Sequence, residues 1–286
     1  MSLSSHLKDN NSLIKQMFDR KFNHIDVFIK EENKKLKEEV VLLPSCEINY
    51  PWSIVGHITE YVLALHIGLP FEELFPMRYL KQLDNNQYQK ITSLNLVKKD
   101  LENSKLKTCL EHLYNLALYE SELRYKGDQA IYTPTLLSSI VYEDVKQIYV
   151  NSLKNFKDAS YEYNPTFDPR FSKYIGGADA DLIEYKQDGN NLIDIKTTKH
   201  NRLERTWIYQ LMGYVALDKN NEHNLKHISI YLPRQNIALE YDVEDVLQKY
   251  TQLKSIDELR SAFGFALISH IEPFNDSNTI RFTLKS

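Results

Sequence analysis

The sequence predicts an α/β fold in which a mixed β-sheet flanked by helices follows a largely helical N-terminal half. Apolar residues recur at helical spacing through most of residues 1–159, whereas polar and apolar residues alternate in short runs after residue 160. Segments with helical spacing lie between and after these runs. We therefore expect a mostly helical region over 1–159 and a sheet-containing core with a C-terminal helix over 160–286.

The N-terminal half divides into helices at its prolines and polar breaks. We predict one amphipathic helix within 11–40, a second helix over 53–69, and three or four more between 70 and 163. Glu60 falls within the otherwise apolar 53–69 helix. An unpaired charge in a core is costly, so this glutamate needs a partner.

The second half alternates strands and helices. In chain order we predict an edge strand at 160–171, a hairpin of strands at 175–185 and 191–197, a helix at 201–218, strands at 227–233 and 236–241, and a helix at 243–263.

The predicted hairpin carries a group of charged residues. Its turn signal is Asp188-Gly189, and the period-two alternation of a strand places Asp194 and Lys196 on one face, opposite to Ile193 and Ile195. The apolar face meets a core, so we expect the charged face to point outward.

The register of the hairpin follows from the length of its turn. If Asp188-Gly189 forms the whole loop, Lys196 lies opposite Asp181, and Asp179 falls one pair further along the strand. Asp181, Asp194 and Lys196 then converge. A loop of odd length would place them on opposite faces.

Two carboxylates beside a lysine suit a hard cation, because Mg²⁺ prefers oxygen ligands and takes one or two carboxylates together with water and phosphate. The residues resemble the motif of the PD-(D/E)XK nuclease superfamily, with Asp181 followed by Asp194-Ile195-Lys196. Ala180 stands where the proline of the motif would be. Gln210 and Tyr214 on the helix that follows resemble the Q-x-x-x-Y element of RecB-like members, and Glu60 resembles the glutamate that such members supply from an earlier helix.

The resemblance implies a restriction-endonuclease-like fold and metal-dependent hydrolysis of nucleic-acid phosphodiester bonds, with DNA as the expected substrate. It implies that Asp181, Asp194, the Ile195 carbonyl and Glu60 bind Mg²⁺, or Mn²⁺, while Lys196 positions or activates a water. The chain has two cysteines, too few for the iron–sulfur cluster of some RecB-like relatives.

Two other interpretations stay open. The acids could be solvated residues on the wet face of an antiparallel sheet, with Lys196 neutralising them. Alternatively, the chain could be a catalytically inactive nucleic-acid-binding or scaffold protein on the same fold, although a binding module has no need of the acid, acid and lysine set.

The composition limits the possible partners and location of the protein but does not identify an activity. A net charge of −4 provides no overall attraction to nucleic acid, so binding would depend on local cations. Lys199, Arg202 and Arg205, directly after the lysine strand, are the candidates for phosphate contacts. The cysteine content favours a reducing, cytoplasmic location, and the sequence shows neither a signal peptide nor an apolar run of membrane-spanning length.

Overall fold

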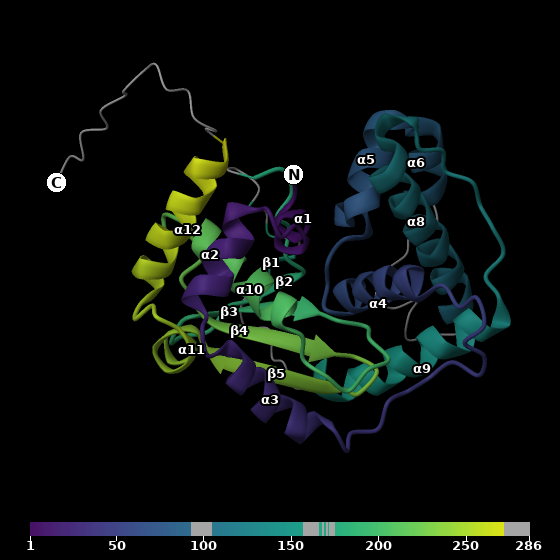
Figure 1. Cartoon of the computed structure of the whole chain (residues 1–286). Helices are drawn as coiled ribbons and strands as arrows, with labels where there is room; N and C mark the ends of the chain where they lie inside the picture. Colours follow the sequence, from purple (N-terminus) through teal and green to yellow (C-terminus); the bar gives the residue numbers. More distant parts are fainter. Residues whose placement is uncertain (93–104, 157–165, 168, 170, 172–174, 272–286) are drawn as a thin grey trace.

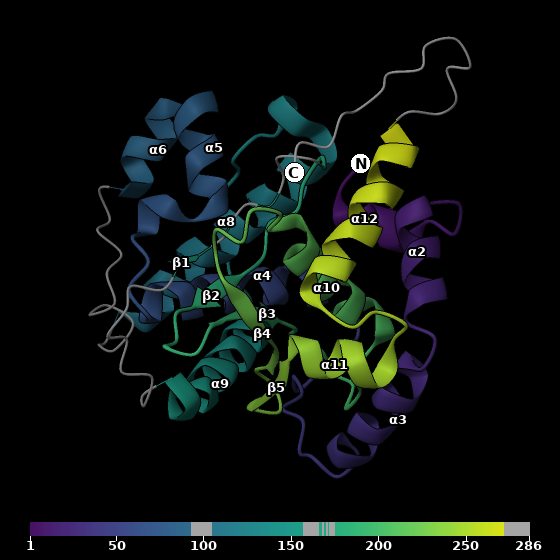
Figure 2. The ribbon, with the colours of Figure 1, turned by 90° about the vertical axis from the view of Figure 1, so that its left-hand side faces the viewer.

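The computed structural model of the chain describes residues 1–92, 105–156, 166–167, 169, 171 and 175–271. It is a mixed α/β structure with one five-stranded sheet between two groups of helices (Figures 1 and 2). The helical N-terminal half and the mixed sheet are both confirmed. Every helix in the described ranges is too short or too polar to cross a membrane.

The sheet has strands in the order β1-β2-β3-β4-β5. Its strands are β1 Thr166–Phe167, β2 Leu182–Glu184, β3 Asn190–Ile195, β4 Leu225–Leu232 and β5 Ile237–Asp242. β3 and β4 pair in parallel, and the other neighbours pair antiparallel. A parallel pair requires a crossover, which here contains helix α10, Arg205–Leu217.

One face of the sheet is covered by helices from both ends of the chain. They are α1 Leu3–Lys8, α2 Leu13–Lys21, α3 Ile25–Leu36, α10, α11 Val243–Tyr250 and α12 Ile256–Ile271. Their apolar side chains form one core with the sheet residues Ile183, Leu192 and Ile230. The first three helices therefore pack with the second half of the chain.

The remaining helices form a second group on the other side of the sheet. They are α4 Trp52–His66, α5 Phe75–Leu83, α6 Asn85–Thr92, α8 Leu106–Lys126 and α9 Ser139–Phe156, with short 3₁₀ turns at Phe71–Glu73 and Gly127–Gln129. We call this group the helical half. Ile195 and Tyr231 of the sheet belong to its core, so Ile195 and Leu192 point to opposite faces as the alternation predicts.

A buried ion pair joins the helical half to the sheet. Arg234, between β4 and β5, is 0% exposed and donates to both carboxylate oxygens of Asp144 on α9, at 2.8 and 2.6 Å. It also donates to the Leu42 carbonyl, and Tyr50 donates its hydroxyl hydrogen to Asp144. The chain between α3 and α4 is thereby fixed to the sheet and to α9.

Two long predicted helices are broken in the structure. The 11–40 segment forms α2 and α3, which are separated at Phe22–His24, and the 243–263 segment forms α11 and α12. At the second break the Thr251 hydroxyl donates to the Leu247 carbonyl at 2.7 Å and accepts from the Leu253 amide at 2.9 Å. This threonine replaces helical hydrogen bonds and ends α11.

The predicted strand at 175–185 is shorter than expected. Only Leu182–Glu184 forms β2. Upstream of it Gly176 donates to the Met1 carbonyl and the Gly177 carbonyl accepts from Leu3, so this backbone is paired with the N-terminal segment rather than with β3. For the edge strand expected at 160–171, the structure shows β1, and the rest of that segment lies mainly outside the described residues.

The expected hairpin register is wrong by two residues. Leu182 pairs with Ile193 and Glu184 with Asn191, so the expected pair of Gln187 and Asn190 does not form. Asn190 instead donates its N–H to the Asn224 carbonyl at 2.9 Å, and its side chain accepts from Lys186. The loop is longer than two residues but still even in length, so the faces of the strands are as expected.

Candidate active site

The three residues of the resemblance come together at the edge where β2 begins and β3 ends. Asp181, directly before β2, accepts the Ile195 N–H on its Oδ2 at 2.5 Å. Asp194 lies on β3, and its Oδ2 is 2.6 Å from Lys196 Nζ. When the observed pairing of Leu182 with Ile193 is continued by one residue, Asp181 falls opposite Asp194, rather than opposite Lys196 as expected.

Asp194 on the charged face of the hairpin is buried and Lys196 is partly buried, which contradicts the expectation that both point outward. Asp194 is only 1% exposed, because helix α10 covers this face of the sheet. The alternative of solvated surface acids is therefore wrong for Asp194. Asp179, two residues before Asp181, is exposed.

Burial and mutual charge set the protonation of these groups. Burial raises the pKa of Asp181 well above its ordinary value, and the charges of Glu60 and Asp194 raise it further. Burial also raises the pKa of Asp194, although the nearby Lys196 ammonium opposes the shift. Burial lowers the pKa of Lys196, but the Asp194 and Asp181 carboxylates outweigh it and hold that pKa above the ordinary lysine value.

Helix α10 holds Lys196 through the two residues that the sequence singled out. Lys196 Nζ donates to Gln210 Oε1 at 3.3 Å, and Gln210 Nε2 donates to the Tyr214 hydroxyl at 2.7 Å. Tyr214 in turn donates to the Asp179 carbonyl at 2.8 Å. The chain of hydrogen bonds fixes the lysine relative to the strand that carries Asp181.

A cavity of about 110 Å³ opens beside Asp181, between the sheet and the helical half. Asp181 and Ile195 line it from the sheet, and Glu60 lines it from α4. Glu60 also lies 3.6 Å from His57 Nδ1. The structure therefore brings Glu60 from a distant part of the sequence to the same cavity as Asp181.

Sequence reasoning missed Glu120 and Arg124 among the residues that line this cavity. Glu120 and Arg124 on α8 both line it, and Glu120 is 2% exposed. The signal was available, because Glu120 follows the apolar run of Leu113, Leu116 and Ala117 at helical spacing, as Glu60 does in its own helix.

The basic residues proposed for phosphate contacts are paired with carboxylates. Lys199 lies 2.6 Å from Glu47 and above the Trp52 ring, and Arg202 contacts Glu204 at 3.0 Å.

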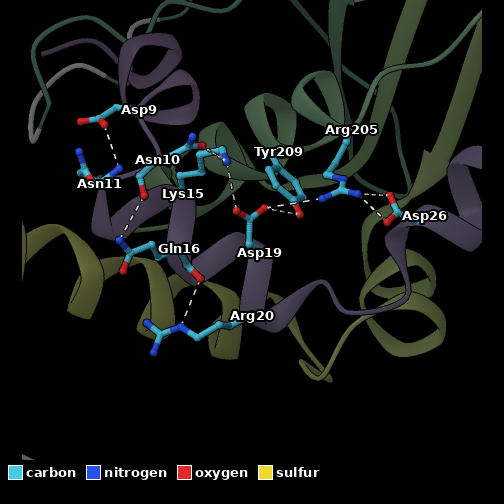
Figure 3. A network of polar contacts seen from close by, with 10 residues as sticks. All are labelled: Asp9, Asn10, Asn11, Lys15, Gln16, Asp19, Arg20, Asp26, Arg205 and Tyr209. Carbon is cyan, nitrogen blue, oxygen red and sulfur yellow. Dashed lines mark hydrogen bonds and ion pairs between the residues drawn. The ribbon is translucent and has the colours of Figure 1, made fainter.

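Arg205, the third of these residues, is paired with carboxylates of the N-terminal helices. It contacts Asp26 at the start of α3 and approaches Asp19 of α2, as Figure 3 shows. The role of all three basic residues toward nucleic acid stays a prediction.

The described acids of the site provide fewer than three ligands for a divalent ion. Among the described residues, no group of three or more His, Cys, Asp or Glu side chains is arranged to hold a metal ion, so Glu60 does not complete such a group. Asp181 and Asp194 still offer two carboxylates. Asp194 Oδ2 is buried and accepts no hydrogen bond from the described residues besides its ionic contact with Lys196. Two carboxylates fit Mg²⁺, which takes its other ligands from water and substrate.

Comparison of the chain with models of known protein families, with curated proteins and with solved structures gave no match.

Proposed function

We propose that the chain is a metal-dependent nuclease that hydrolyses phosphodiester bonds, with DNA as its substrate. The observation that carries the proposal is the buried carboxylate of Asp194, with Lys196 Nζ at 2.6 Å and Asp181 directly before the neighbouring strand β2. Burying Asp194 and partly burying Asp181 and Lys196 is costly, and apolar residues of similar volume would stabilise the fold as well or better. A chemical role explains why these residues occupy the site.

The fold supports the proposal at the level of topology. An antiparallel hairpin carries the acids and the lysine, helix α10 follows, and β4 returns parallel to β3. This order agrees with the restriction-endonuclease-like fold implied by the motif. Because one fold can host many functions, the activity itself depends on the residues of the site.

Asp181, Asp194 and the Ile195 carbonyl would hold Mg²⁺ or Mn²⁺. The bound ion would lower the pKa of a water and stabilise negative charge on the phosphate. The two acids raise the pKa of Lys196, so its ammonium would donate hydrogen bonds in the site. Its ammonium would orient the attacking water and offset phosphate charge, while Gln210 fixes its position.

A second candidate is a nucleic-acid-binding or scaffold protein without turnover. Two observations favour it: Lys196 already neutralises Asp194, and no three-acid group is present in the described part of the chain. Such a protein would keep the fold and would not need a metal.

Incubation of the purified chain with labelled nucleic acids separates the two candidates. The substrates are linear and circular DNA and RNA, each single- and double-stranded, with Mg²⁺, Mn²⁺ or EDTA. We expect cleavage of DNA with either metal and none with EDTA. Binding without cleavage under every condition would support the scaffold and overturn the nuclease.

A further inference from the structure

The cavity beside Asp181 is strongly acidic. Five carboxylates among the described residues line it, from Glu60, Glu73, Glu120, Asp179 and Asp181. A phosphodiester is itself an anion, so a strand that enters the cavity needs a cation to face it. Arg124 is the cationic side chain among the described residues that line the cavity.

The guanidinium of Arg124 is held in one orientation. Its Nε donates to Glu120 Oε1 at 2.7 Å, and its Nη2 contacts the same oxygen. The ring of Phe75 packs against it, with the guanidinium carbon 5.1 Å from the ring centroid. A cation fixed in this way loses little conformational entropy when it binds an anion.

Glu120 is itself anchored. The carboxylate is buried, accepts the Tyr61 hydroxyl hydrogen on Oε2, and lies 3.8 Å from His57 Nδ1. Burial raises the pKa of Glu120, whereas the charges of His57 and Arg124 oppose the shift. The salt bridge therefore joins a rigid, buried acid to an arginine whose side chain is 59% exposed.

An arginine carries five N–H donors, and Glu120 occupies only the Nε edge and one Nη2 position. The remaining donors form the planar fork that suits phosphate oxygens. We propose that Arg124 binds a phosphate of the substrate strand in the cavity, an inference that rests on the proposed nuclease function. Arg124, from the helical half, and Asp181, from the sheet, then contact the strand from opposite sides.

The test measures binding of the full chain to a fluorescently labelled DNA oligonucleotide. It uses an Asp194→Asn background to prevent cleavage, single-stranded and duplex arms, and a series of salt concentrations. We expect Arg124→Gln to weaken binding about tenfold and to reduce the slope of log affinity against log salt by about one. A smaller slope reports the loss of a phosphate contact. Substitution of a residue with a purely structural role would leave the slope unchanged.

Lys126→Gln is the matched control. Lys126 forms an i,i+4 pair with Glu122 on the same helix, as Arg124 does with Glu120, but it does not line the cavity. We expect its affinity and its slope to equal those of the background protein. Arg124→Lys keeps the charge without the fork, so we expect it to retain the slope and lose part of the affinity.

Loss of Arg124 leaves the buried Glu120 carboxylate without its cation. Thermal unfolding is therefore measured for each variant, to establish that it folds. If Arg124→Gln does not fold, the double variant Glu120→Gln/Arg124→Gln replaces both charges with neutral groups and provides the same readout. An unchanged slope and affinity in a folded variant would overturn the inference. Absence of DNA binding by the Asp194→Asn protein would also overturn it. Cleavage by the parent chain is judged separately, so loss of this inference alone leaves the nuclease proposal standing.

Discussion

Asp194 Oδ2 and Lys196 Nζ lie 2.6 Å apart beneath helix α10, two residues apart in the chain. Asp194 is buried and Lys196 is partly buried, so each charge depends on the other for stabilisation in the metal-free protein. The pair therefore couples the proposed chemistry of the site to the stability of the fold. Substitutions here should change both activity and the free energy of unfolding.

Lys196→Ala should abolish cleavage and lower the free energy of unfolding by about 3 kcal/mol. The loss arises because Asp194 stays buried without its cation. Protonation of Asp194 limits the size of this loss of stability. The double variant Asp194→Asn/Lys196→Met should recover most of that stability without recovering activity. Urea denaturation of the three proteins in EDTA measures the effect. If Lys196→Ala is as stable as the parent, the two side chains are not coupled.

The pH dependence of stability follows from the raised pKa values of Asp181 and Asp194. In the unfolded chain these groups titrate near the ordinary value of about 3.9. As pH rises from that value through the raised values, the unfolded chain has already released protons that the folded chain still holds, so the folded state loses stability. Lys196 does not contribute to this decline, because its stabilisation is complete below the unfolded lysine pKa and is lost only above it.

Asp181→Asn removes one of the two carboxylates and should flatten this decline. The measurement is the urea midpoint in EDTA from about pH 4 to about pH 8. Parent and variant curves that run parallel would show that Asp181 ionises in the folded protein as it does in the unfolded chain. Cleavage by the parent should rise over the same range, as the carboxylates ionise.

Tyr214→Phe removes the hydroxyl that joins Gln210 to the Asp179 carbonyl. Gln210, whose Oε1 accepts a hydrogen bond from Lys196, then loses its fixed orientation. We expect a fall in kcat of about tenfold or more, as is usual for residues that orient a metal site. The cost to stability should be about 1 kcal/mol, the typical value of one hydrogen bond. Equal kcat for the two proteins would remove Tyr214 from the site.

Much of this arrangement could be predicted from sequence because it depends on local periodicity. Alternation placed Asp194 and Lys196 on one face and Ile195 on the other, and the four-residue spacing of Gln210 and Tyr214 placed both toward the strand. The contacts that sequence could not predict are made between distant segments. Asn190 bonds to Asn224 and shifts the register, and α10 covers a face that a hairpin alone would leave open.

The buried pair of Arg234 and Asp144 is another such contact, 90 residues apart in the chain. Arg234→Ala should lower the free energy of unfolding by about 3 to 5 kcal/mol, because Asp144 would stay buried without its partner. The control is Lys249→Ala, which removes an exposed i,i+4 pair with Asp245 and should leave the urea midpoint unchanged. Equal midpoints for the Arg234 variant and the parent would show that this pair does not hold the helical half to the sheet.

Cleavage of labelled DNA by Asp194→Asn, beside the parent and Asp188→Asn, tests the central claim most directly. Asp188 lies in the turn of the same hairpin, is 75% exposed, and makes only a 3.5 Å contact with His227 among the described residues. With Mg²⁺ we predict full activity for the parent and for Asp188→Asn, and none for a folded Asp194→Asn protein. Undiminished cleavage by Asp194→Asn would show that the acids and lysine of this hairpin do not form the active site.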